Sequence, residues 1–473
     1  MSQPRSYLAD LLRLAGPVAL ARLGIIGMAI VDVIVVGQLA PDELPHQALG
    51  WAPTAVFLVA AIGLLQGVQV LAARALGEGN SEGAGVALRR GLVMAAAAGI
   101  VSAAAMIAAG QSLFDVFGIE RDLAVHATPV MLILAWSIPL HLLYIAGTYY
   151  LEAIKKPGIS TAVMWGANLV NLGLNLLWVP EHGAIGSAWA TVGARVFLSG
   201  LLLLWILVLP SSREYGVRKL AAKGPSYGAL FAIGIASAVS QAVEAGAFSA
   251  MTVIAGRLGA AVVAGYQIML NLMAFVFMIA LGMAAATAVL VSEAVGRRAP
   301  DDAARAGWTG LGANTVAMLI AAGAIVYFAS PIGRLYTADA ELAALIAAMM
   351  WIAALILTPD GAQVVIASAL RARGDNWFPT FSHILAYAVI MPVLGYWLAE
   401  LHGQGVPALN AWLLALEHRE VAGLMFAILI SSIVSALVLL LRWWALAGRP
   451  LMPGADDTPI AGIAETEARD PLG

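Results

Sequence analysis

The sequence predicts an all-α polytopic membrane protein, with twelve transmembrane helices in two six-helix lobes around a central cleft. Composition, the lengths of the apolar segments and an internal repeat lead to this prediction. Of the 473 residues, 61% are hydrophobic and only 11% are charged, and the mean hydropathy is +0.89. Soluble domains carry roughly 25% charged residues, so most of this chain is suited to lipid rather than to water.

Apolar segments long enough to cross a bilayer, about 20 residues each, follow one another along the chain. The first of them, near Arg5 and Arg13, is longer than the core of a cleaved signal peptide, so we expect it to be retained. The least marked boundary lies within 227–293, at the motif GRLGA. The expected spans are residues 11–39, 46–73, 87–112, 125–150, 159–179, 183–209, 227–256, 260–293, 306–330, 341–370, 378–400 and 421–446.

Connections and the tail divide the chain into four parts. The longest basic connection falls near the midpoint, and the C-terminal tail is rich in Pro, Gly, Asp and Glu, a composition typical of disorder. We expect an N-terminal lobe at 1–212, a cytoplasmic linker at 213–226, a C-terminal lobe at 227–446 and a disordered cytoplasmic tail at 447–473.

The two halves repeat each other at an offset of 219 residues. The stretch GLLQGVQVLAARALGEGN (63–80) aligns with GMAAATAVLVSEAVGRRA (282–299), and the same offset aligns VVGQL (35–39) with IAGRL (254–258). Repeats of six spans have the same orientation in the membrane, so the lobes should be related by a pseudo-twofold axis along the membrane normal. The acids are not repeated, since Asp32 aligns with Met251 and Glu244 with Ile25.

Loop charges predict the orientation, because Lys and Arg concentrate in cytoplasmic loops. With the N-terminus inside, the outer connections hold only Arg121, Arg257, Arg334 and Arg419. We therefore expect a multi-pass membrane protein with both termini in the cytoplasm. The inner connections hold Arg74, Arg89, Arg90, Lys155, Lys156, Arg213, Arg218, Lys219, Lys223, Arg297, Arg298, Arg305, Arg371 and Arg373.

Several functions are disfavoured by what the chain does not contain. It has no cysteine, which rules out thiol chemistry, and a net charge of −3 gives no reason to expect a nucleic-acid partner. HExxH, GxSxG and P-loop motifs are absent, and the seven histidines are not spaced as metal ligands. We expect a protein that is not an enzyme, has no cofactor and functions as a monomer in the lipid bilayer.

Polar residues within the apolar spans are the candidates for function. A charge at the bilayer centre costs at least about 2.5–3.5 kcal/mol, so it should face the protein interior or a water-filled cavity. Amides at such positions also serve as hydrogen-bonding contacts between helices, which is the structural alternative. The candidates are Asp32; Asn168, Asn171 and Asn175 on one helix face; Gln241 and Glu244; Gln267 and Asn271; and Asp360, directly after Pro359.

These residues and their surroundings resemble the multidrug and toxic compound extrusion (MATE) family, in its NorM-like bacterial branch. The resemblance covers roughly residues 8–446. It rests on VDVIVVGQL around Asp32, on GLLQGVQVLAARALGEGN, on VEAGAFS around Glu244, and on two long second-half stretches. These are VAGYQIMLNLMAFVFMIALGMAAATAVLVSEAVG and DGAQVVIASALRARGDNWFP.

The resemblance implies two groups of site residues. Asp32, Asn171, Asn175 and Thr191 would form a site for a coupling cation, H⁺ or Na⁺, in the first lobe. Glu244 and Asp360 would bind the coupling cation or the substrate in the second lobe, with Gln241, Gln267 and Asn271 as polar cavity residues. The chain departs from many relatives at Tyr266, where His is common, and at Ile356, where some sodium-coupled relatives have Tyr, which weakens the case for sodium in the second lobe.

The physics of buried acids suggests a mechanism. A carboxylate removed from water takes up a proton or attracts a cation, so H⁺, Na⁺ and an amphipathic organic cation would compete for one acidic cavity. Inward flow of H⁺ or Na⁺ would then drive multidrug efflux by antiport. A flippase for lipid or lipid-linked oligosaccharide from the same wider superfamily is the alternative. Such a protein would need several basic residues in its cavity to bind anionic pyrophosphate headgroups. A channel would have no need of duplicated lobes with unduplicated acids.

Overall fold

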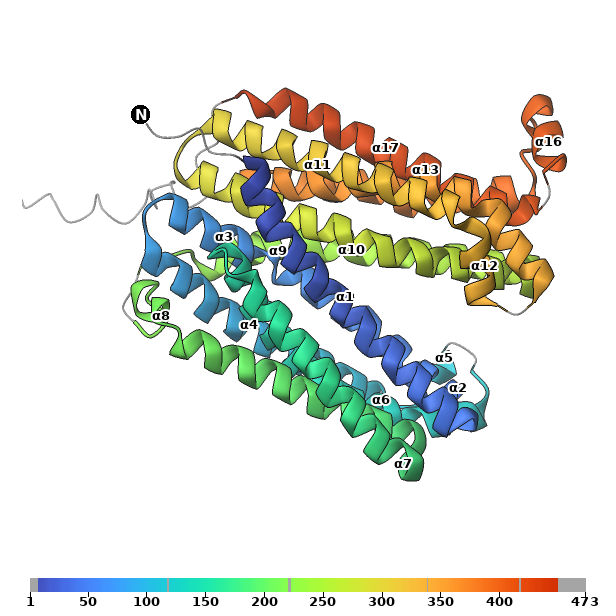
Figure 1. The fold of residues 1–473 in the computed structure, drawn as a ribbon, viewed down its shortest axis with the longest axis horizontal. Coiled ribbons are helices and arrows are strands. Elements are labelled where there is room, and N and C mark those ends of the chain that lie inside the picture. The colour runs from blue at the N-terminus through green and yellow to red at the C-terminus, as the bar shows by residue number, and fades with distance from the viewer. Residues whose placement is uncertain (1–6, 117–118, 220–222, 338, 417, 450–473) are drawn as a thin grey trace, which may run out of the picture.

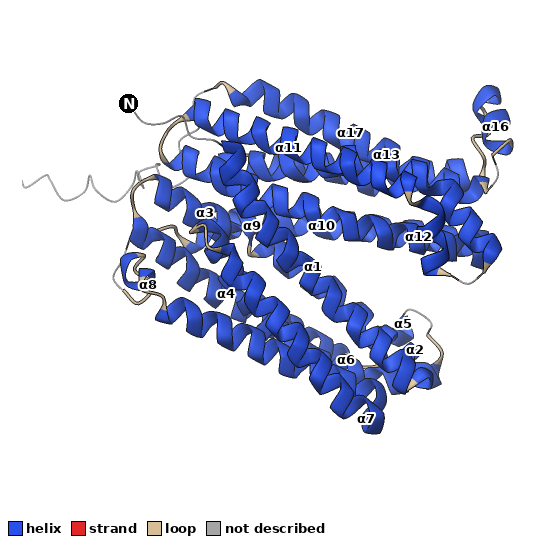
Figure 2. Cartoon of the chain, viewed as in Figure 1, coloured by secondary structure: helices blue, strands red, loops and turns tan. Residues whose placement is uncertain are grey.

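The computed structural model describes residues 7–116, 119–219, 223–337, 339–416 and 418–449. Within these residues every regular element is helical (Figure 2). Most of the tail expected at 447–473, and part of the linker expected at 213–226, lie outside the described residues.

The N-terminal half folds into one lobe. Its longest helix, α7 (Pro157–Val208), is interrupted at Gly183, whose φ of 54° and ψ of −131° are not helical. Pro180 lies just before this point and lacks the N–H needed to continue the helix. This helix therefore supplies two spans. The other elements of the lobe are α1 (Tyr7–Leu39), η1 (Pro41–Glu43), α2 (Leu44–Leu64), α3 (Gln66–Gly77), α4 (Ser81–Ala109), α5 (Ser112–Val116) and α6 (Arg121–Ala153).

The C-terminal half forms the second lobe after the short helix α8 (Ser211–Glu214). Its eleventh span is irregular, because two π-helical segments, η2 (Ile384–Ile390) and η3 (Tyr396–Glu400), alternate with α14 (Trp377–His383) and α15 (Met391–Gly395). The other elements are α9 (Tyr227–Leu258), α10 (Ala260–Gly296), α11 (Pro300–Tyr327), α12 (Ala329–Tyr336), α13 (Ala340–Arg373), α16 (Pro407–Leu414) and α17 (Arg419–Ala447).

Eleven helical segments of the described chain are long and apolar enough to cross a membrane. One of them, 52 residues long, is α7 with its interruption at Gly183, so the spans number twelve. Each predicted span matches one of these helices to within three residues where it extends past a helix end, as 87–112 and 306–330 do. The boundary expected at GRLGA coincides with the end of α9 at Leu258. The predicted fold class is confirmed.

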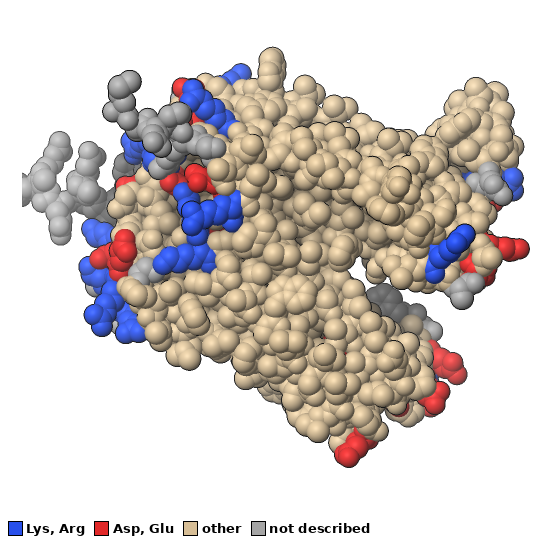
Figure 3. All heavy atoms as spheres, viewed as in Figure 1, with Lys and Arg blue, Asp and Glu red and all other residues tan. Residues whose placement is uncertain are grey.

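The lobes meet at one end and separate at the other (Figure 1). Helices α1 and α9 both begin at the convergent end, as expected of repeats with the same orientation. Figure 3 shows most of the visible Lys and Arg gathered at this end, with acidic residues among them, whereas the divergent end shows acidic residues, a few basic ones and a hollow between the lobes. At the convergent end Arg74 of α3 donates to the carbonyl of Ala372 across the lobes at 3.0 Å, and Lys155 pairs with Glu293.

Equivalent side chains make equivalent contacts in the two lobes. Thr161 Oγ1 donates to the Pro17 carbonyl at 2.7 Å, and Thr380, 219 residues later, donates to the Ala236 carbonyl at 2.7 Å. Because Pro17 and Ala236 are also 219 residues apart, the offset seen in the sequence describes the three-dimensional packing.

The contact between the lobes has twofold character: where one residue of the first lobe contacts a residue of the second, their repeat equivalents make the reverse contact. Gly63 lies against Ala238, and Gly282 lies against Ala19, each residue being 219 positions from its equivalent. The equivalent pair Gly77 and Gly296 meet each other, so the pseudo-twofold axis passes between them. A Cβ on Gly77 would collide with the Glu293 carbonyl oxygen, and a Cβ on Gly296 would collide with that of Arg74. Only glycine permits this approach of the backbones.

Candidate functional site

Asp32 joins three helical segments in the N-terminal lobe. It lies buried in α1, where Asn175 Nδ2 donates to its Oδ1 at 2.7 Å and Thr191 Oγ1 donates to its Oδ2 at 2.9 Å. Asn175 precedes the interruption of α7 at Gly183 and Thr191 follows it. The change of direction in α7 therefore brings donors from both of its halves to the same carboxylate.

Asn171 and Asn175 add polar atoms without partners next to this carboxylate. Both asparagines are fully buried, and Asn175 Nδ2 also donates to the Asn171 carbonyl at 3.0 Å. Asn171 lies close enough to Asp32 to interact with it electrostatically. Among the described residues, neither side-chain polar atom of Asn171 has a hydrogen-bond partner, and neither does Asn175 Oδ1. Amide and carboxylate oxygens are the ligands that hard cations prefer, so this group fits a proton or a small monovalent cation.

A cavity of about 350 Å³ opens beside Asp32. Most of its wall is apolar and comes from α1, α2, α6 and α7, which are all in the N-terminal lobe. The volume lies in the range of small-molecule pockets, roughly 300–1,000 Å³. Its polar or charged lining residues are Asp32, Gln47, His141, Ser187, Thr191 and Arg195.

Arg195 lies on the wall of this cavity and is only 3% exposed. Its Nη1 donates to Ser137 Oγ at 2.6 Å, and its guanidinium carbon lies 5.3 Å from the centre of the Trp51 ring. Sequence reasoning did not place this residue at the site. Its position four residues after Thr191, on the same face of the helix, is the signal that could have done so.

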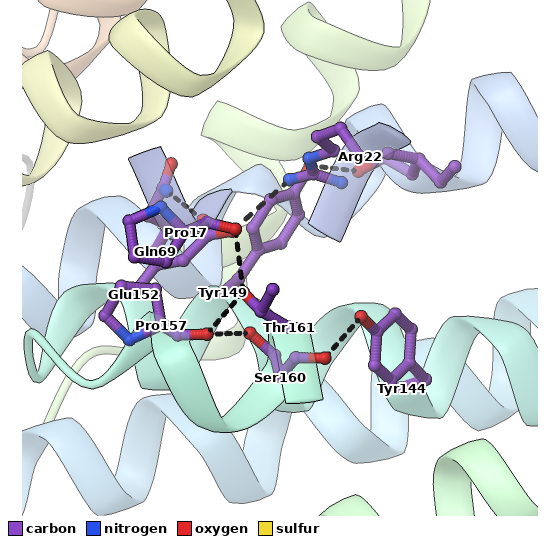
Figure 4. Close-up of polar contacts among 10 residues, drawn as sticks. Pro17, Arg22, Gln69, Tyr144, Tyr149, Glu152, Pro157, Ser160 and Thr161 are labelled. Atoms are coloured by element: carbon purple, nitrogen blue, oxygen red, sulfur yellow. Dashed lines mark hydrogen bonds and ion pairs between the residues drawn. The ribbon is translucent and has the colours of Figure 1, made fainter. Parts of the chain in front are cut away.

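A second charged group, formed by Arg22 and Glu152, lies in the same lobe. Figure 4 shows Arg22 of α1 and Gln69 of α3 reaching Glu152 near the end of α6. Arg22 Nη2 lies 3.6 Å from Glu152 Oε1, Gln69 donates to Glu152 Oε2, and the Arg22 guanidinium faces the Tyr149 ring at 5.4 Å. Sequence reasoning missed Glu152 because its partners are distant along the chain.

In the C-terminal lobe, two hydroxyl groups donate hydrogen bonds to Asp360. Tyr387 Oη and Ser432 Oγ donate to its Oδ1 at 3.2 and 3.3 Å. Glu244 is half-buried and makes no hydrogen bond or ion pair with the described residues, but it lies within electrostatic range of Asp360 and of Arg371. Arg371 is buried near the end of α13, so this lobe has a basic neighbour that helical spacing around the acids did not indicate.

The remaining predicted residues do not line the N-terminal cavity. Gln267 and Asn271 are exposed on α10, where Gln267 Nε2 donates to Thr252 at 3.1 Å and Asn271 Oδ1 accepts from Tyr336 at 3.3 Å. Gln241 is half-buried on α9, and Asn168 donates to the carbonyls of Gly24 and Met164. Among the described residues, no group of three His, Cys, Asp or Glu side chains could hold a metal ion.

Comparison with known proteins decides the family. The MatE family model matches residues 17–177 and again 236–397, so its two matches begin 219 positions apart, as the internal repeat does. The chain belongs to the MatE family. It is therefore a multi-pass membrane transporter.

Curated relatives of this MatE protein match most of its length. A probable multidrug resistance protein NorM of Caulobacter vibrioides is 40% identical over 444 residues, covering 92% of this chain and 91% of the relative. A probable NorM of Deinococcus radiodurans is 31% identical, covering 85% and 90%. The multidrug resistance protein PmpM of Pseudomonas aeruginosa is 27% identical, covering 83% and 84%.

Solved structures of MATE proteins share the fold. A multidrug resistance MATE transporter of the MOP superfamily, described as outward-facing, has a TM-score of 0.82 at 20% identity, covering 93% of this chain and 96% of the other. A MATE protein described as being in the straight conformation also has a TM-score of 0.82, at 22% identity with 93% and 97% coverage.

Proposed function

We propose that this MatE protein exports amphipathic organic cations across the bacterial inner membrane in exchange for inward H⁺ or Na⁺. The observation that carries the proposal is Asp32, a buried carboxylate that joins α1 to both halves of α7 on the wall of a largely apolar cavity. The relatives named as multidrug resistance proteins support export of drugs.

Coupling would act through the hydrogen bonds of Asp32. As a carboxylate it accepts from Asn175 and Thr191 at once, whereas a protonated carboxyl group must donate through one oxygen. Uptake of a proton would therefore weaken one of these two links and loosen α1 against α7. It would also remove the negative charge that holds a cationic substrate, so the two ligands would compete.

Loop charge supports an orientation for this cycle. Because Lys and Arg gather at the convergent end, that end would face the cytoplasm, and the hollow between the lobes would open outward. The cysteine-free chain makes this testable. Residue 81 replaced by cysteine (Ser81→Cys) should resist a membrane-impermeant maleimide in intact cells, whereas Arg121→Cys should react. The opposite labelling would reverse the orientation.

A direct test of transport uses proteoliposomes loaded with ethidium, an amphipathic cation. A proton or sodium gradient, imposed separately, should drive ethidium movement through wild-type protein in the direction opposite to the ion. Movement that depends on neither gradient would contradict antiport. Movement of a pyrophosphate-linked lipid instead of ethidium would favour the flippase, which the cavity does not favour because the arginine on its wall is accompanied by an aspartate.

A further inference from the structure

Two side chains cross between the lobes at the convergent end from equivalent positions of the repeat. Arg74 of the first lobe donates to the Ala372 carbonyl of the second at 3.0 Å. Glu293, which lies 219 positions after Arg74, pairs with Lys155 of the first lobe. The two contacts differ in kind, because one uses a neutral backbone acceptor and the other joins two charged side chains.

Lys155 has a backbone conformation that is unusual for a residue with a side chain. It lies beyond the last residue of α6 with a φ of 59°, and its repeat equivalent Gly374 lies beyond the last residue of α13 with a φ of 105°. Both helices end with the same pair of hydrogen bonds, in which the N–H groups of positions 155 and 156, or 374 and 375, reach the carbonyls three and five residues earlier. Glycine is the usual residue at such a helix end because it adopts a positive φ without steric cost. The first lobe thus has a lysine where the backbone favours glycine.

The contact that Lys155 makes with its ammonium group gives a reason for this departure. The group pairs with Glu293 Oε2, and the other oxygen of this carboxylate accepts from Arg297 Nη1 at 2.7 Å. The lysine side chain is 40% exposed and the glutamate 16%, and ion pairs of this exposure add little to stability. A cavity of about 190 Å³, lined also by Leu76 and Tyr215, lies beside the pair and gives the lysine room to move away. The pair is therefore suited to repeated opening and closing.

A transporter with two lobes opens its binding sites to one side of the membrane and then to the other. In this structure the lobes are apart at the divergent end and meet at the convergent end (Figure 1). The contacts at the convergent end must therefore separate before the sites open there. We propose that Lys155 and Glu293 form a latch that holds the convergent ends together, and that its release sets how often they part. The latch is independent of which ion or substrate is carried.

The spacing of the convergent ends can be measured because the chain has no cysteine of its own. Spin labels on Ser81→Cys, at the start of α4, and on Asp301→Cys, in the first turn of α11, would report the distance between the lobes by double electron–electron resonance. Detergent-solubilised full-length protein should show mainly the short distance of the closed end. Lys155→Gly should raise the ratio of long to short distances roughly two- to fivefold, as for loss of a partly exposed ion pair.

Lys155→Gly also separates the effect of charge from an effect on folding. It removes the ammonium group but supplies the residue that the left-handed position favours, so thermal stability in detergent should be unchanged or higher. Lys155→Arg keeps the charge and should keep the wild-type distances. Glu293→Gln should shift the distances as Lys155→Gly does, and the double variant should shift them no further than either change alone. Unchanged distances in both single variants would overturn the latch, and a loss of thermal stability with unchanged distances would make the pair structural.

A reversible cross-link tests whether these ends must part during transport. Protein with Lys155→Cys and Glu293→Cys, joined by a short bifunctional methanethiosulfonate, should lose ethidium transport in proteoliposomes, and a reductant should restore it. The matched control joins Lys219→Cys to Glu82→Cys, which replace an ion pair of 2.8 Å between the linker and α4 that does not connect the lobes. This control should transport normally. Full transport by the cross-linked Lys155→Cys and Glu293→Cys protein would overturn the latch.

The latch and the proposed antiport can fail separately. If no ion gradient drives ethidium through wild-type protein, the antiport proposal is wrong, but the distance measurements still decide the latch because they need no substrate. If wild-type protein transports ethidium while the distances do not respond to the charge at position 155, only the latch is overturned.

Discussion

The two lobes share a scaffold but differ in their charged interior. The hydrogen bonds of Thr161 and Thr380 are alike. The charged residues differ, because the repeat equivalent of Asp360 is His141 and the repeat equivalent of Arg371 is Glu152. The first lobe holds its acid Asp32 with amide and hydroxyl donors beside an arginine. The second clusters two acids near an arginine and uses hydroxyl donors. Packing contacts are thus common to both lobes, whereas the groups suited to ion and substrate chemistry are not.

The largest expected effect is on gradient-driven transport, and it should distinguish Asp32 from every other acid. Asp32→Asn keeps the shape of the side chain but removes its charge, so gradient-driven transport of ethidium in proteoliposomes should fall to the rate of protein-free liposomes. Expression and folding should stay near wild type. Asp42→Asn, at an exposed acid of η1, serves as the control and should transport normally. Unchanged transport by Asp32→Asn would remove this residue from coupling.

The two glycines that meet at the pseudo-twofold axis, Gly77 and Gly296, should be equally sensitive to substitution. A methyl group at Gly77 or Gly296 would collide with backbone of the other lobe, and overpacking typically costs about 1–3 kcal/mol. Gly77→Ala and Gly296→Ala should therefore lower the unfolding temperature in detergent by similar amounts. Gly200→Ala should not, because no atom beyond its own stretch of helix lies within 4 Å of the place its methyl group would take. Markedly unequal losses would show that the axis lies elsewhere.

The acids of the second lobe should affect the affinity for cationic ligands rather than folding. Glu244→Gln and Asp360→Asn should each weaken binding of tetraphenylphosphonium more than binding of neutral triphenylphosphine oxide, by about tenfold or 1.4 kcal/mol. The loss should shrink as the pH falls, because the wild-type carboxylates then become protonated and lose the same charge. Titration of both ligands at two pH values measures this. An equal, pH-independent loss for both ligands would make these acids structural.

The smallest expected effect is on thermal stability, and it tests the packing hydrogen bonds that the two lobes share. Thr161→Val and Thr380→Val remove equivalent hydrogen bonds to backbone carbonyls, each worth about 0.5–1.5 kcal/mol. Their effects on thermal unfolding in detergent should match. Transport should be unaffected once the protein is folded. A large difference between the two would mean that the equivalence of the lobes does not extend to their energetics.

Much of the fold could be predicted because membrane helices are encoded locally in the sequence. Length and apolarity define the spans, and the repeat in 63–80 and 282–299 defines the relation of the lobes. The group of Asp32, Asn171, Asn175 and Thr191 came from family resemblance. The structure places Asn175 and Thr191 in hydrogen-bond contact with Asp32, while the functional roles of these residues stay predictions.

Contacts between distant segments could not be predicted in the same way. The pair of Arg22 and Glu152 depends on how α1 packs against α6, and the proximity of Arg371 to Glu244 depends on how α13 packs against α9. Helical periodicity describes one face of one helix and carries no information about the neighbour. For the same reason, spacing alone did not show that Gln267 is exposed or that Arg195 borders the cavity.

The meeting of Gly77 with Gly296 has a consequence for how such a chain can change by mutation. In a homodimer of identical six-helix subunits, a residue on the twofold axis would face its own copy, and every substitution would alter both subunits at once. Fusion into one chain removes that constraint, because each half mutates alone. One lobe can then acquire an aspartate where the other has a methionine, as Asp32 and Met251 illustrate. Positions on the axis, in contrast, still constrain each other because they are in contact. Covalent linkage thus permits two unlike sites on one symmetric frame.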